Sequence, residues 1–145
     1  MRGDPSQMSH SAEFAQYAND GNEDRDSPTI LTIRITLNSE NALGPGKIRL
    51  MELIMESGSI SAASRAMGMS YRRAWMLAHT LNNTFREAVI LKKVGGSHGG
   101  GAELTDLGRD VVARYRKIEC LSNEVAATEL EFLRSAARTA LPNAK

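Results

Sequence analysis

The stretch GSISAASRAMGMSYRRAWMLAHTLN (residues 58–82) predicts two consecutive helices joined by a tight turn. Ser59 can cap a first, short helix and Ser70 can cap a second. Between them, Gly68 can adopt the left-handed conformation that ends a helix abruptly. Small residues stand where two helices crossing at a steep angle need close approach, namely Ala63 and Ala74. The stretch therefore predicts a helix-turn-helix.

Apolar residues recur at helical spacing and define the inward faces of both helices: Ile60, Ala63 and Met67 in the first, and Ala74, Leu77, Ala78, Leu81 and Phe85 in the second. The first turn of the second helix is then exposed and basic. In a helix-turn-helix this turn faces base edges in the major groove, while hydroxyls and amides at helix starts hold phosphates. We expect Arg72 and Arg73 to provide specificity, since an arginine fork matches guanine. Positioning contacts are expected from Ser59, Ser70 and Tyr71. An ordinary helical hairpin with solvated arginines is the alternative.

The flanking segments complete a winged-helix plan. Alternating apolar residues predict a strand over residues 29–38, with Leu31, Ile33, Ile35 and Leu37 on its buried side. A helix follows the break at residues 44–46 and ends near Gly58. Short β-type segments at residues 88–94 and 102–104 enclose GGSHGGG (residues 95–101) and predict a hairpin, the wing. Thr105 can cap a last helix that, if it is continuous, would reach about residue 135.

Lysines and a histidine accompany the Gly-rich loop of this hairpin. As a wing, the loop brings backbone close to a phosphate or the minor groove, with contacts from Lys92, Lys93 and His98. The alternative is a loop without a binding role. A nucleotide-binding loop is excluded, because the segment lacks the Lys-Ser/Thr pair and opens no helix.

The last helix carries a seven-residue apolar repeat, made of Val111, Ile118, Val125 and Phe132 beside Leu107 and Leu121. A helix of this length exceeds the needs of one small core, so the repeat predicts pairing with a second copy of the chain. A homodimer would place two recognition helices about one DNA turn or a multiple apart, which predicts an inverted-repeat target in double-stranded DNA.

Composition agrees with a cytoplasmic protein that is not embedded in a membrane. Of 145 residues, 41% are hydrophobic and 24% charged, and no apolar run is long enough for a membrane span or a secretory signal. Residues 1–28 carry two basic and six acidic side chains, and the rest carries sixteen basic and eleven acidic. We therefore expect three parts: a disordered acidic arm (1–28), a DNA-binding domain (29–104), and a dimerisation helix with its tail (105–145).

Catalytic, metal and cofactor sites are not expected. His10, His79 and His98 lie in unlike settings, and the single Cys120 lies on the long helix, so no zinc spacing occurs. His79 is expected on the helix surface or against a neighbour. Cys120 is expected to be an ordinary helix residue, with a crosslink between subunits as the alternative. No arrangement of a nucleophile with a base, or of paired carboxylates, is recognisable.

Four blocks of the chain resemble, in sequence and order, the DNA-binding domain of the molybdate-responsive ModE regulators, which is related to the LysR-type winged helix. The blocks are GPGKIRLMELI, GSISAASRAMGMSYRRAWMLAHTLNN, GGSHGGGAELT and LGRDVVARYR, within residues 29–117. The resemblance implies a winged helix whose dimer contact uses the first and last helices. It also implies DNA contacts by the recognition helix and wing, at Ser70, Tyr71, Arg72, Arg73, Ser97 and His98.

Full-length members of that family continue into small β-barrel modules that bind molybdate, whereas this chain ends at Lys145. We therefore expect a stand-alone version of the DNA-binding half, with an effector that is not identified. The fold class is mainly α with a small β-sheet. The expected function is sequence-specific transcriptional regulation as a dimer. Two alternatives remain: a winged-helix module that pairs with another regulator, and an oxyanion-responsive sensor.

Overall fold

The first helix of the fold forms where proline and glycine mark its ends. In the computed structural model, which describes residues 31–94 and 101–138, helix α2 spans Pro45–Ser57. Proline suits its first turn, because the amide that it lacks would have no helical partner there. The helix ends at Gly58, whose φ of 71° lies in the left-handed region and whose N–H donates to the Ile54 carbonyl at 2.8 Å. Its inward residues are buried: Ile48, Leu50, Met51, Leu53 and Ile54.

The predicted helix-turn-helix is confirmed, with helix α3 at Ile60–Ala66 and helix α4 at Tyr71–Thr84. Ser59 Oγ accepts a hydrogen bond from the Ala62 amide, and Ser70 Oγ accepts one from the Arg73 amide, both at 3.1 Å. Gly68 has a φ of 64°, as the turn between the helices requires. The expected inward residues of α4 are buried or half-buried.

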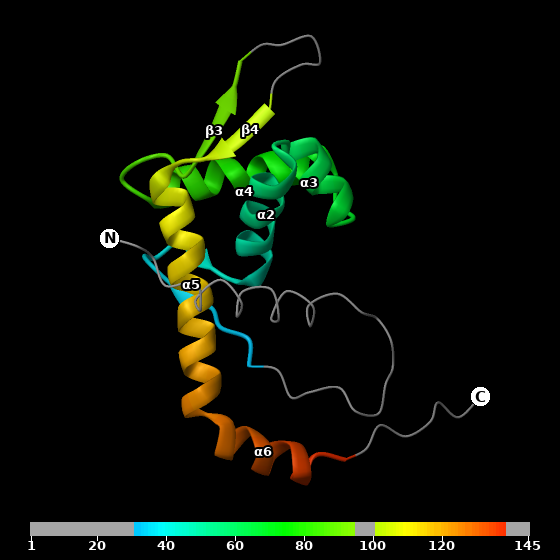
Figure 1. Ribbon diagram of the computed structural model, residues 1–145, viewed down its shortest axis with the longest axis vertical. Coiled ribbons are helices and arrows are strands. Elements are labelled where there is room, and N and C mark those ends of the chain that lie inside the picture. The colour runs from blue at the N-terminus through cyan, green and yellow to red at the C-terminus, as the bar shows by residue number, and fades with distance from the viewer. Residues whose placement is uncertain (1–30, 95–100, 139–145) are drawn as a thin grey trace, which may run out of the picture. The chain divides into compact units, whose positions relative to one another are not determined.

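The predicted wing is present as an antiparallel pair, β3 (Ile90–Lys93) and β4 (Gly101–Leu104). Ile90 pairs with Leu104 at its base and Lys93 with Gly101 at its outer end. Figure 1 shows the two strands standing out from helices α2, α3 and α4. Only the base of the hairpin is buried, at Ile90, Ala102 and Leu104. The wing therefore joins the core through these residues, while its outer end is exposed.

The N-terminal strand is much shorter than predicted. Only β1 (Ile35–Thr36) forms, paired with an unpredicted β2 (Ala42–Leu43). Alternating burial holds from residue 31 to residue 36, but Leu37 is 44% exposed rather than inward. The reason is a turn in which the Leu37 amide donates to the Asn41 carbonyl at 2.9 Å, after which α2 begins almost at once. Among the described residues, β1 therefore has only this two-residue partner, and residues 29 and 30 of the predicted strand lie outside them.

The long C-terminal helix is present, but a break divides it into two helices, so it is not continuous to residue 135. Helix α5 spans Asp106–Val125 and helix α6 spans Ala127–Ala136, with Ala126 at φ −88° and ψ 1°. None of the α6 residues is buried, so little packing opposes a break in the helix there. Residues 31–123 form one compact unit, and α6 falls outside it.

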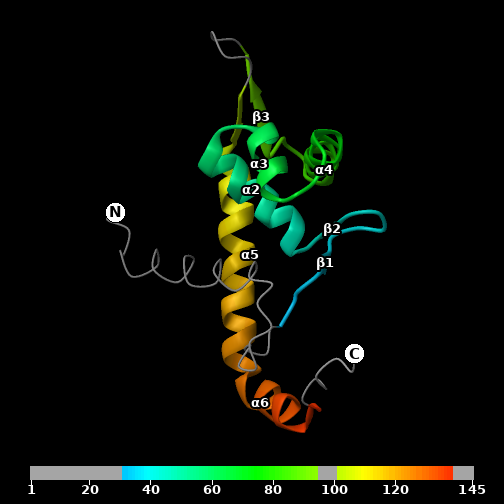
Figure 2. The same cartoon turned by 90° about the vertical axis from the view of Figure 1, so that its right-hand side faces the viewer.

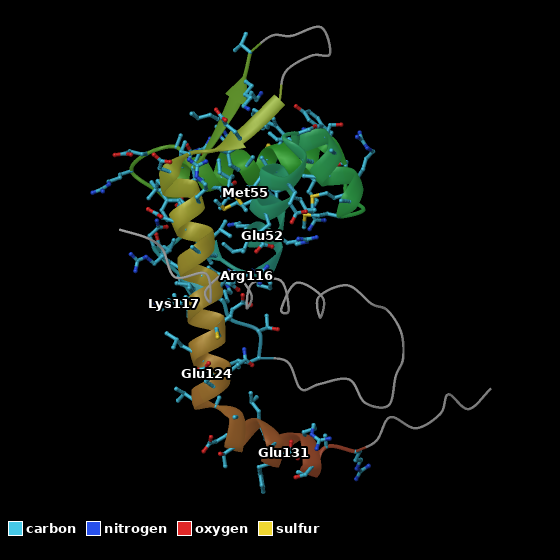
Figure 3. The ribbon with its side chains drawn as sticks, in the orientation of Figure 1. Glu52, Met55, Arg116, Lys117, Glu124 and Glu131 are labelled. Carbon is cyan, nitrogen blue, oxygen red and sulfur yellow. The ribbon has the colours of Figure 1, made fainter. Side chains whose placement is uncertain are left out.

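Within this unit, α5 is attached to the other elements by polar as well as apolar contacts. Tyr115 is buried, and its hydroxyl donates to the Ile33 carbonyl at 2.6 Å. Burial raises the pKa of Tyr115 to about 12, so the hydroxyl keeps its proton, and can donate this bond, even at alkaline pH where an exposed tyrosine would ionise. Arg116 donates to both carboxylate oxygens of Glu52 on α2, at 2.7 and 2.9 Å, and Figure 3 shows these two residues where α2 and α5 meet. Glu119 also accepts from Arg116 at 2.6 Å.

The start of α5 lies against the segment that leads into the wing, as both views show (Figures 1 and 2). The Thr105 amide donates to the Val89 carbonyl at 3.0 Å, and the Thr105 hydroxyl donates to the Ala88 carbonyl at 2.8 Å. The same hydroxyl accepts from the Gly108 amide at 3.0 Å, so the predicted cap at Thr105 is confirmed. A Cβ on Gly108 would stand 2.2 Å from the Val89 carbonyl oxygen.

Replacing Gly108 by alanine is expected to destabilise the fold, because neither backbone can move aside without shifting α5. We expect a loss of about 1–3 kcal/mol or more in the free energy of unfolding, measured by urea denaturation. The matched control is Gly46→Ala in α2, where a Cβ would meet nothing within 4 Å. That variant should gain up to about 1 kcal/mol. Equal effects of the two substitutions would contradict the close approach at Gly108.

Candidate nucleic-acid interface

The first turn of α4 presents a basic, solvent-exposed surface. Tyr71 is 52% exposed, and Arg72 and Arg73 are exposed beside it. Neither guanidinium forms an ion pair with a described residue. The Arg73 backbone amide is already used by the Ser70 cap, but both arginine side chains remain available for an external acceptor. The structure thus gives this turn the exposure that the sequence predicted, and an arginine fork needs such exposure to reach a base edge.

Ser59 differs from Ser70 in its exposure. The Ser59 side chain is half-buried and holds the Ala62 amide, whereas Ser70 is exposed. A hydroxyl that accepts one hydrogen bond still has a proton to donate, so neither capping role prevents contact with a phosphate oxygen. Ser70 is the more accessible of the two.

The two wing lysines occupy different electrostatic settings. Lys93 Nζ lies 3.3 Å from a carboxylate oxygen of Glu103 on β4, which partly neutralises its charge. Lys92 points to the other side of the strand, since successive side chains of a strand alternate. Its Nζ lies 5.5 Å from the ring centroid of Trp75 on α4, within the range of a cation–π interaction. Lys92 therefore carries the less compensated charge.

Trp75 belongs to a small cluster on α4 that the sequence analysis did not identify. Its ring stacks on the His79 ring at a centroid distance of 5.3 Å and an interplanar angle of 7°. His79 Nε2 lies 3.1 Å from Asn83 Nδ2, one further turn along. The spacing of four residues could have indicated neighbours on one helix face. The prediction that His79 lies on the surface against a neighbour is confirmed.

Asn82 is a second residue that the sequence analysis missed. Its Oδ1 accepts hydrogen bonds from the Val89 and Ile90 amides, and its Nδ2 donates to the Ile90 carbonyl, all at 2.9 Å. The side chain thus joins the end of α4 to the start of β3. A polar residue next to Leu81, on the inward side of an amphipathic helix, was the available signal, because a buried amide needs partners.

The wing loop predictions at Ser97 and His98 lie outside the described residues. Among residues 31–94 and 101–138, no group of three or more His, Cys, Asp or Glu side chains is arranged to hold a metal ion. None of the helices in this part of the chain combines the length and apolar character of a membrane span.

Comparison with known proteins supports the resemblance seen in the sequence. The molybdenum transport protein ModE of Azotobacter vinelandii is 41% identical over 88 residues, covering 59% of this chain and 33% of that protein. The molybdenum-pterin-binding protein MopA of Rhodobacter capsulatus is 33% identical over 94 residues, covering 65% and 36%. The DNA-binding transcriptional dual regulator ModE of Escherichia coli K12 is 34% identical over 85 residues, covering 57% and 32%.

The chain spans about a third of the length of these curated relatives. No family model matches it. A solved LysR family transcriptional regulator gives a TM-score of 0.44 at 20% identity, covering 64% of this chain and 29% of that one, a likeness too weak to establish a shared fold. The similarity in sequence to the ModE and Mop proteins does not depend on this structural comparison. Over more than half of its length, this winged-helix chain is similar to the ModE and Mop proteins.

Proposed function

We propose that this chain is a transcriptional regulator that binds double-stranded DNA through α4 and the wing. The observation that carries the proposal is the exposed first turn of α4, where Arg72 and Arg73 form no ion pair with described residues. This turn begins the second helix of a helix-turn-helix, the helix that enters the major groove in DNA complexes of this motif. Similarity to a protein named as a DNA-binding transcriptional regulator supports the same function.

Each proposed contact has a distinct role. Arg72 and Arg73 read base edges, while Ser70 and Tyr71 fix the helix on the phosphate backbone. Ser59 adds a phosphate contact from the start of α3. Lys92 and Lys93 bring positive charge along the wing, and the loop residues Ser97 and His98 extend that contact. Substitutions of the residues that contact bases should therefore change the sequence preference. Substitutions of the residues that contact phosphates should change the salt dependence of binding.

Replacing Arg72 or Arg73 by alanine should weaken binding to the sequence that the wild-type protein enriches from random DNA. The loss of a bidentate base contact is worth about 1–3 kcal/mol, or roughly a 5- to 150-fold rise in Kd. Fluorescence anisotropy at constant salt measures it. The matched control is Arg138→Ala, which removes an exposed arginine that follows α6 and should change the Kd little. Unchanged affinity in both α4 variants would favour the alternative, a module that pairs with another protein.

We further propose that the chain acts as a homodimer whose contact involves α2 and α5. On α5, Leu107 and Val111 pack on the core, but Ile118 and Leu121 are 40% and 49% exposed. Met55 on α2 is 49% exposed, and Figure 3 marks its position. The first part of the predicted seven-residue repeat thus serves this chain's own core, and the second part is left for a partner. Two recognition helices would then read an inverted repeat.

Replacing Leu121 by glutamate should dissociate the dimer, because a carboxylate would be buried without a partner. We expect the dimer dissociation constant to rise by at least roughly tenfold, as each 1.4 kcal/mol corresponds to a factor of ten. Sedimentation equilibrium is the measurement. Leu91→Glu is the matched control, since Leu91 is similarly exposed, at 46%, but lies on the wing. A dimer that is equally stable in both variants would place the interface elsewhere.

A further inference from the structure

Asn82 uses its whole amide group at the junction between α4 and the wing. Both acceptor and donor sides are satisfied by the backbone of two consecutive residues, Val89 and Ile90, through three hydrogen bonds of equal length. These groups come from the residue that precedes β3 and from its first residue. An amide bonded on both sides in this way fixes the rotation of the chain as well as its distance from the helix.

A second contact joins the same two elements farther out. Trp75 precedes Asn82 by seven residues, which is about two helical turns, so both lie on the same side of α4. Lys92 follows Ile90 by two residues on the same face of β3, and its Nζ lies over the Trp75 ring. The strand is thus held to the helix at two points, which sets its direction as well as its starting position.

These contacts fix β3 relative to α4, while β4 is fixed to α2, where the Ala102 amide donates to the Gly58 carbonyl at 2.8 Å. Beyond Ile90 every residue of β3 is exposed, including Leu91 at 46%, and Val94, which follows the strand, is 98% exposed. An isolated two-stranded hairpin has marginal stability in water, because it has too little apolar area to bury. Its direction must therefore come from its attachments to the helices, and on the β3 side these are the contacts of Asn82 and Lys92.

We propose that Asn82 is a positioning residue for DNA recognition, which holds the wing in the direction that lets the wing and the first turn of α4 contact one duplex together. The Lys92–Trp75 contact supports the same alignment. This inference rests on the proposed DNA-binding function and adds that Asn82, which need not touch DNA, determines how much the wing contributes to affinity.

The chain offers a closely matched pair of substitutions, Asn82→Ala and Asn83→Ala. Asn83 is the next residue of the same helix, and its side chain is bonded to His79 within α4 rather than to the wing strands that the structure describes. Measured on the duplex that the wild-type protein selects from random DNA, Asn82→Ala should raise the Kd by roughly tenfold, and Asn83→Ala should not. A hydroxyl-radical footprint of Asn82→Ala should lose the protection due to the wing and keep the protection due to α4.

Double variants separate alignment from general destabilisation. Lys92→Ala should weaken binding in the wild-type background but have little further effect in the Asn82→Ala background, because the wing is already displaced. Arg72→Ala should cause the same loss in both backgrounds. An equal effect of Lys92→Ala in both backgrounds would overturn the proposal. If Asn82→Ala does not fold, Asn82→Asp keeps both acceptor bonds, replaces only the donor to Ile90, and should show the same pattern more weakly.

Amide hydrogen exchange tests the attachment without DNA. The Val89 and Ile90 amides should exchange roughly tenfold faster in Asn82→Ala, since each loses its acceptor, while the amides of α2 keep their rates. Unchanged exchange at both amides would overturn the proposal. If the wild-type protein selects no duplex, the proposed function fails, and the exchange rates still decide whether Asn82 holds the strand.

Discussion

The backbone of residues 88–90 is the junction on which the rest of the structure depends. Asn82 at the end of α4 binds Val89 and Ile90, Thr105 at the start of α5 binds Ala88 and Val89, and β3 begins at Ile90. Three separate elements, α4, β3 and α5, therefore share one short segment. Because its amides and carbonyls are bonded to side chains as well as to backbone, a shift of one element would leave polar groups of another unpaired.

The junction explains why position 108 on α5 is a glycine. Gly108 lets α5 lie against the Val89 carbonyl, where any side chain would collide.

Farther along α5, Arg116 binds Glu52 of α2, and the pKa of its guanidinium is raised above the usual value mainly by these hydrogen bonds. Because both side chains are largely buried, removing one would leave an uncompensated charge. The long helix is thereby fixed to the helices that position α4.

The sequence predicted the parts whose chemistry is local. The caps at Ser59, Ser70 and Thr105 and the turn at Gly68 follow from single residues, so they could be located without a structure. Long-range features could not: the role of Asn82 depends on a strand that begins eight residues later, and the shortness of β1 depends on its two-residue partner. No proline or glycine occurs near Ala126 that could have indicated the break in the sequence. In the candidate interface, exposure of the basic turn was predictable, but the pairing of Lys93 with Glu103 and the position of Lys92 over Trp75 were not.

The proposed function requires that α4 and the wing form one surface that reads DNA in a dimer. The most direct measurement is selection of random double-stranded DNA by the purified wild-type protein, sequenced after selection at two salt concentrations. We expect enrichment of an inverted repeat with half-sites about one helical turn or a multiple apart, still enriched at the higher salt. Binding that loses all sequence preference and disappears as salt rises would contradict it.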